Sequence, residues 1–67
     1  MLELTANGAI MQLESTATIA DLIQQMGLGE RRLAVERNGD IVPRSLYTRT
    51  QLSTGDCIEI VVAVGGG

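Results

Sequence analysis

The chain has 67 residues, a net charge of −3 and 45% hydrophobic residues, which fits one small domain with a thin core. The negative charge argues against a nucleic-acid partner, because such binding depends on a basic surface. One cysteine excludes an internal disulfide, and without histidine we expect no metal site and no cofactor. We find no signal peptide and no apolar run near the ~20 residues that span a bilayer. A cytoplasmic protein that does not bind membranes is therefore expected.

Residues 2–14 predict a β-hairpin. Leu2 and Leu4 alternate with polar side chains, which is the period of a half-buried strand. The dipeptide Asn7-Gly8 follows, and both residues tolerate the positive φ of a type I′ turn. Met11 and Leu13 continue the alternation, so a second, antiparallel strand is expected after the turn.

A helix is predicted to start at Thr18. Its hydroxyl can cap the free amides of the first turn, and Asp21 places negative charge where the helix dipole favours it. Gly27 is suited to the left-handed residue that ends a helix. One apolar stripe runs along the helix, formed by Ile19, Leu22, Ile23 and Met26.

Two short strands are expected in the middle of the chain. Residues 33–36 alternate in character and are followed by Asn38-Gly39, a second turn signal. Residues 41–42 form a short strand that ends at Pro43, which has no N–H to donate. Residues 44–54 are irregular, with a short turn of helix.

The last strand is predicted over residues 57–64. Ile58 and Ile60 are expected to face the helix, which directs Cys57, Glu59 and Val61 to the other face. The element order predicts an α+β protein of the β-grasp type. Its mixed sheet has four to five strands, one helix crosses one face, and the first and last strands are parallel neighbours in the middle. Residues 1–64 form the domain, and residues 65–67 form a flexible glycine tail.

The side chains offer little chemistry of their own. Cys57 is interpreted as a small strand residue and not as a nucleophile, so no catalytic residue is assigned and we do not expect an enzyme. The acidic residues interpreted as a solvated surface are Glu3, Glu14, Asp21, Glu36, Asp40, Asp56 and Glu59.

The glycines that close the sequence are the strongest functional signal. Gly65-Gly66-Gly67 has no Cβ, so the segment can enter a slot that rejects other residues. We expect Gly67 to be the terminal residue and its α-carboxylate to be the reactive group, activated with AMP by a partner, because the chain has no ATP site of its own. The surface expected to contact this partner consists of Ala34, Val61, Ala63 and Val64.

The sequence resembles the ThiS family of sulfur carriers. The resemblance covers essentially the whole chain and rests on two segments: residues 38–44 (Asn-Gly-Asp-Ile-Val-Pro-Arg) and residues 55–67, from Gly-Asp-Cys-Ile-Glu-Ile-Val to the glycines. It implies a ubiquitin-like β-grasp fold. It also implies that an ATP-dependent activating enzyme adenylates Gly67, that a sulfur donor protein converts it to a thiocarboxylate, and that thiazole synthase receives the sulfur in thiamine biosynthesis.

Three alternatives remain open from the sequence. A sulfur carrier of another pathway, such as the small subunit of molybdopterin synthase or a carrier for tRNA thiolation, would share the glycine ending and the activation step. A ubiquitin-like protein modifier would also use Gly67 but would transfer it to an amine. A plain interaction module would keep its activity without Gly66 and Gly67.

Overall fold

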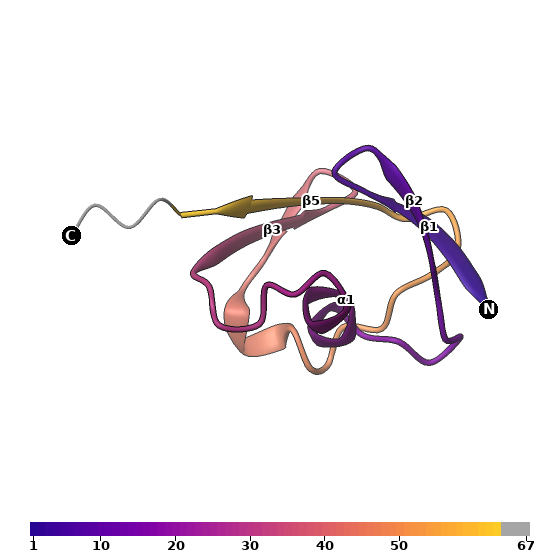
Figure 1. The fold of residues 1–67 in the computed structure, drawn as a ribbon, viewed down its shortest axis with the longest axis horizontal. Helices are drawn as coiled ribbons and strands as arrows, with labels where there is room; N and C mark the ends of the chain where they lie inside the picture. The colour runs from indigo at the N-terminus through magenta and orange to yellow at the C-terminus, as the bar shows by residue number, and fades with distance from the viewer. Residues whose placement is uncertain (64–67) are drawn as a thin grey trace.

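Figure 1 shows the chain as a computed structural model, in which residues 1–63 are described. Within these residues, five strands form one mixed sheet in the order β2-β1-β5-β3-β4, and α1 lies across one face of it. The predicted α+β β-grasp arrangement is confirmed. The elements in chain order are β1 (Leu2–Ala6), β2 (Ala9–Leu13), α1 (Ile19–Gln25), β3 (Leu33–Arg37), β4 (Asp40–Val42), the 3₁₀ helix η1 (Arg44–Leu46) and β5 (Cys57–Val62).

The last strand lies in the middle of the sheet, as predicted. β5 pairs in parallel with the end of β1, where Thr5 is opposite Cys57, and antiparallel with all of β3. β5 extends to Val62, which lies opposite Leu33, the first residue of β3. The predicted strand end at Val64 and the predicted tail at 65–67 lie outside the described residues.

Both Asn-Gly turns have the predicted backbone conformation. Asn7 and Gly8 have φ of 51° and 82°, and Asn38 and Gly39 have φ of 52° and 88°. Positive φ at two successive residues is what a two-residue type I′ hairpin requires. The first turn joins β1 to β2, and the second joins β3 to β4.

The ends of α1 follow the sequence signals. Thr18 and Asp21 form a reciprocal capping box: the Thr18 hydroxyl accepts from the Asp21 N–H, and Asp21 accepts from the Thr18 N–H at 2.9 Å. At the other end Gly27 has φ of 75°, and the Leu28 N–H donates to the Ile23 carbonyl. Within residues 1–63, no helix combines the length and the apolar character needed to cross a membrane.

Among residues 1–63, the fully buried hydrophobic side chains between α1 and the sheet are aliphatic, and the partly buried Tyr47 packs against them. Ile19 and Leu22 of the helix are fully buried against the sheet residues Val35 and Ile58. Leu52, from the irregular segment after η1, belongs to the same buried cluster. A small core of this kind makes the domain sensitive to the loss of any one large side chain.

Leu22→Ala is expected to lower the free energy of unfolding by about 3 kcal/mol, because it leaves a cavity under the helix. Urea denaturation followed by circular dichroism measures the change. Ile10→Ala is the matched control: Ile10 is 69% exposed, so its truncation should change stability by less than about 0.5 kcal/mol. Equal losses in the two variants would contradict the assignment of the core.

Candidate functional site

The two faces of β5 differ as the alternation predicts. Ile58 and Ile60 are buried against the helix side, whereas Cys57, Glu59 and Val61 are exposed on the open face of the sheet. Val61 is 62% exposed, which is unusual for a branched apolar residue of a central strand. This face is therefore the one that can be reached by a partner.

The structure brings together part of the predicted partner surface. Val61 lies directly opposite Ala34 in the β3–β5 register, and both are exposed. Ala63 follows the strand, is exposed, and donates its N–H to the carbonyl of Arg32 at 2.9 Å. Val64 and Gly65-Gly66-Gly67 lie outside the described residues. The role of these residues in binding a partner stays a prediction.

Acidic side chains adjoin this apolar pair on the same face. Glu36 of β3 lies directly opposite Glu59 of β5, and Ile41 of β4, 77% exposed, lies opposite Glu36 on its other side. Directly opposed like charges destabilise a sheet. Within residues 1–63, neither glutamate forms an ion pair. Both glutamates are exposed, as predicted. That they lie opposite each other depends on the register of β3 against β5, which the sequence did not indicate.

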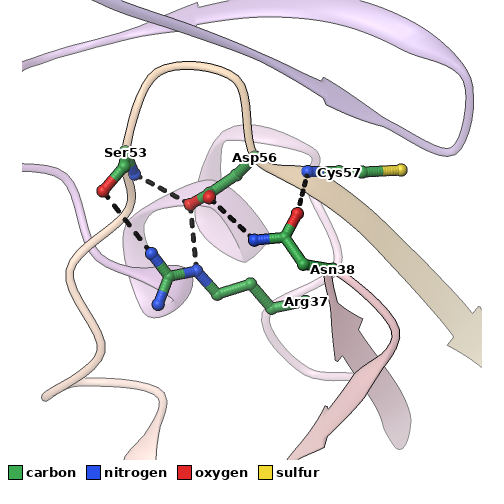
Figure 2. A network of polar contacts seen from close by, with 5 residues as sticks. All are labelled: Arg37, Asn38, Ser53, Asp56 and Cys57. Atoms are coloured by element: carbon green, nitrogen blue, oxygen red, sulfur yellow. Dashed lines mark hydrogen bonds and ion pairs between the residues drawn. The ribbon is translucent and has the colours of Figure 1, made fainter.

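Asp56, immediately before β5, is buried, with 6% of its surface exposed. The prediction that it belongs to a solvated acidic surface is wrong. The Arg37 Nε and the Ser53 N–H donate to its Oδ2 at 2.9 and 2.8 Å. Asn38 Nδ2 donates to its Oδ1 at 3.0 Å, and Figure 2 shows the three partners converging on one carboxylate. These donors replace the water that the carboxylate loses on burial.

The same contacts set the charge state of Asp56. Burial alone raises the pKa of its carboxyl, but hydrogen bonds from Asn38, Ser53 and Arg37, together with the Arg37 charge, outweigh that effect. The pKa therefore lies below its ordinary value of 3.8. Asn38 also accepts the Cys57 N–H at 2.8 Å, so the network ties the β3–β4 turn to the first residue of β5 (Figure 2).

A second asparagine holds β5 from the other side. The Asn7 side chain accepts the Ile60 N–H at 2.7 Å and donates to the Ile60 carbonyl at 3.1 Å. Its backbone N–H donates to the Ile58 carbonyl at 2.9 Å. β1 ends at Ala6. The Asn7 side-chain amide therefore makes the two hydrogen bonds to Ile60 that a further strand residue of β1 would otherwise make. The turn signal located Asn7 in the sequence but gave no sign of this second role.

Cys57 lies on the open face, and its side chain points away from the polar network (Figure 2). Its thiol has no histidine to activate it, since the chain contains none. Within residues 1–63, no group of three potential metal-ligating side chains is found. The described residues thus offer a supported strand and an accessible face.

The mixed sheet crossed by one helix, with a central last strand, defines a β-grasp protein. Residues 2–67 match the model of the ThiS family, so the chain belongs to that family. Over 54 residues it is 41% identical to the sulfur carrier protein ThiS of Bacillus subtilis, covering 81% of this chain and 82% of the relative. The crystal structure of the thiamine biosynthesis protein ThiS from Geobacter metallireducens superposes with a TM-score of 0.81 at 25% identity, covering 98% of this chain and 100% of that one.

A longer relative is also similar. The chain is 38% identical over 66 residues to a thiazole synthase of Paramagnetospirillum magneticum, covering 98% of this chain. It spans only 20% of the length of that relative. A segment like this one therefore occurs within a protein that is named as a thiazole synthase.

Asp56→Asn is expected to flatten the acid limb of the stability profile. Because the folded-state pKa is depressed, the charged carboxylate stabilises the fold above its unfolded value near 3.8, and this contribution disappears as the pH falls through the lower folded-state pKa. Denaturant unfolding from about pH 7 to 2 measures the dependence. In the variant the free energy of unfolding should be lower at pH 7, by about 2 kcal/mol, and should fall less on acidification.

Asp40→Asn is the matched control for this prediction, because Asp40 is exposed and lies at the same β3–β4 turn. Its profile should follow that of the unmodified chain. An unchanged acid limb in Asp56→Asn would contradict the assigned role of the network.

Proposed function

We propose that this chain, a ThiS-family sulfur carrier, holds sulfur as a thiocarboxylate at Gly67 and delivers it for thiazole formation in thiamine biosynthesis. The observation that carries the proposal is the family match, which extends over residues 2–67 and so includes the glycines. The accessible open face of the sheet, which includes β5, supports the proposal, because a carrier needs a surface for docking as well as a reactive end.

The chemistry needs a partner at each step. A carboxylate oxygen is a poor leaving group, so an ATP-dependent activating enzyme would first join the Gly67 carboxylate to AMP and release pyrophosphate. Sulfur from a donor protein would then take the place of the oxygen that leaves with AMP. The chain acts as a co-substrate in the cytoplasm, and its own residues contribute position and recognition.

Thiazole synthase is the proposed acceptor. The similarity between this chain and a segment of the Paramagnetospirillum thiazole synthase supports that pairing, because it places a segment of this kind within a protein named as a thiazole synthase. The apolar pair Ala34 and Val61, with Ala63 beside it, is the proposed contact for partners. Val64 would extend this surface toward the glycines.

The intact mass of the chain after incubation with ATP, the activating enzyme and a sulfur donor tests the proposal. We expect the gain that corresponds to exchange of one oxygen for sulfur, located in the peptide that contains Gly67. Gly67→Ala should reduce the modified fraction about tenfold or more, since a misplaced reacting group loses rate steeply. Cys57→Ser should retain the full gain. A gain that depends on Cys57, or none with an enzyme active on another carrier, would refute the proposal.

Val61→Ser tests the proposed contact surface. Because Val61 is 62% exposed, the change should alter the free energy of unfolding by less than about 0.5 kcal/mol. Loss of apolar contact should raise the KM of the activating enzyme for the carrier about fivefold, with little change in kcat. Ile10→Ser is the matched control, because Ile10 is also exposed on the open face but lies on the distant strand β2. Equal KM values for the two variants would show that the apolar pair Ala34 and Val61 is not the contact.

A further inference from the structure

The backbone of β5 is hydrogen-bonded unevenly on its two sides. Alternate residues of a strand direct their N–H and C=O groups to opposite edges. On the β3 side, the Cys57 carbonyl accepts from the Asn38 N–H at 2.8 Å, and the Ala63 N–H donates to the Arg32 carbonyl at 2.9 Å. The backbone N–H and C=O groups of the odd-numbered residues from 57 to 63 therefore point toward the β3 side, where β5 is paired with β3.

The backbone N–H and C=O groups of the even-numbered residues point toward β1. On this side the hydrogen-bond partners end before β5 does. The Ile58 carbonyl accepts from the Asn7 backbone, and both backbone groups of Ile60 are bonded to the Asn7 side chain. The next residue in this series is Val62, and β1 has already ended at Ala6. Within residues 1–63, the N–H and C=O of Val62 have no hydrogen-bond partner.

This open edge lies on the path to the glycines. Figure 1 shows β5 running beyond β1 and its turn toward the C-terminal end of the chain. Val62 is followed by Ala63 and Val64 and then by three residues without side chains. A protein that holds such a segment has few side chains to recognise and must rely on main-chain hydrogen bonds. Unpaired strand edges form those bonds with another extended backbone.

We propose that an extended segment of the activating enzyme adds to the β1-side edge of β5 and bonds to the backbone N–H and C=O of Val62. This inference rests on the proposed function and names how that partner grips the carrier. The Asn7 side chain fixes where the pairing starts, because it closes the edge at Ile60 and leaves the next position open. Recognition by backbone pairing also fits a strand whose neighbouring tail is almost without side chains.

A second copy of the chain is the competing occupant of this edge. Each copy has a net charge of −3, and Glu59 lies in the strand concerned, so two copies repel as their edges approach. This repulsion disfavours self-pairing.

Methylation of the Val62 backbone nitrogen in a chemically synthesised full-length chain tests the proposal. The methyl group removes the donor and blocks the edge, but it breaks no hydrogen bond of the free carrier. We expect unchanged unfolding and about a tenfold rise in the KM of the activating enzyme for the carrier, measured by ATP–pyrophosphate exchange. A KM within about twofold of that of the unmethylated chain would overturn the proposal.

A matched control exists on β2, at the outer edge of the sheet. The Thr5 N–H donates to the Asp56 carbonyl on the β5 side, so Ile10, its partner in the β1–β2 register, directs its N–H to the outer edge of β2. Methylation of the Ile10 nitrogen should leave both unfolding and KM unchanged. An equal rise in KM for the two methylated chains would show a general effect of the modification and overturn the proposal.

Hydrogen exchange of the Val62 amide separates this inference from the proposed function. The amide should exchange rapidly in the free carrier and become protected when the activating enzyme is added without ATP. Protection that instead rises with the concentration of the carrier alone would assign the edge to self-pairing. If the unmethylated chain gains no sulfur at Gly67 but Val62 is still protected by the enzyme, the proposed chemistry fails and the edge contact stands.

Discussion

The geometry of this protein depends on β5, whose two neighbouring strands come from distant parts of the sequence. Its parallel contact with β1 joins residues more than 50 positions apart, as in the pair Thr5 and Cys57. No turn connects β5 to either neighbour, so nothing local sets its register. Side chains at two turns supply that register instead. Asn38 fixes the first residue of the strand, and Asn7 fixes Ile60 near its end.

These two asparagines each have a backbone role and a side-chain role. Each adopts positive φ, so that it can form its turn, and each uses its amide to hold the backbone of β5. Buried polar contacts are seldom the main source of stability, because desolvation offsets much of their attraction. Here burial of the small aliphatic core stabilises the fold, and the Asp56 network fixes the position of the first residue of β5.

The sequence predicted those features that depend on near neighbours or on a regular period. The cap at Thr18, the Asn-Gly turns and the alternation of β5 are all of this kind, and the position of β5 in the sheet followed from the order of the elements. The burial of Asp56 could not be predicted, because its donors Arg37 and Asn38 lie 18 or 19 positions away and meet it only once β3 has paired with β5. The opposition of Glu36 and Glu59 depends on the same register. Within the candidate site, Ala34 and Val61 lie opposite each other because β3 pairs with β5. The glycines lie outside the described residues.

The parallel pairing of β1 and β5 also determines how the molecule can be tethered. Parallel neighbours start at the same end of a sheet and leave at the same opposite end, so Met1 and Ala63 lie at opposite ends of the molecule (Figure 1). A label, a solid support or another folded domain attached ahead of Met1 is thus held far from the end of β5 that leads to the glycines. Attachment at that end leaves the open face and the free edge of β5 accessible to large enzymes. The topology thus separates an attachment point at Met1 from the end of β5.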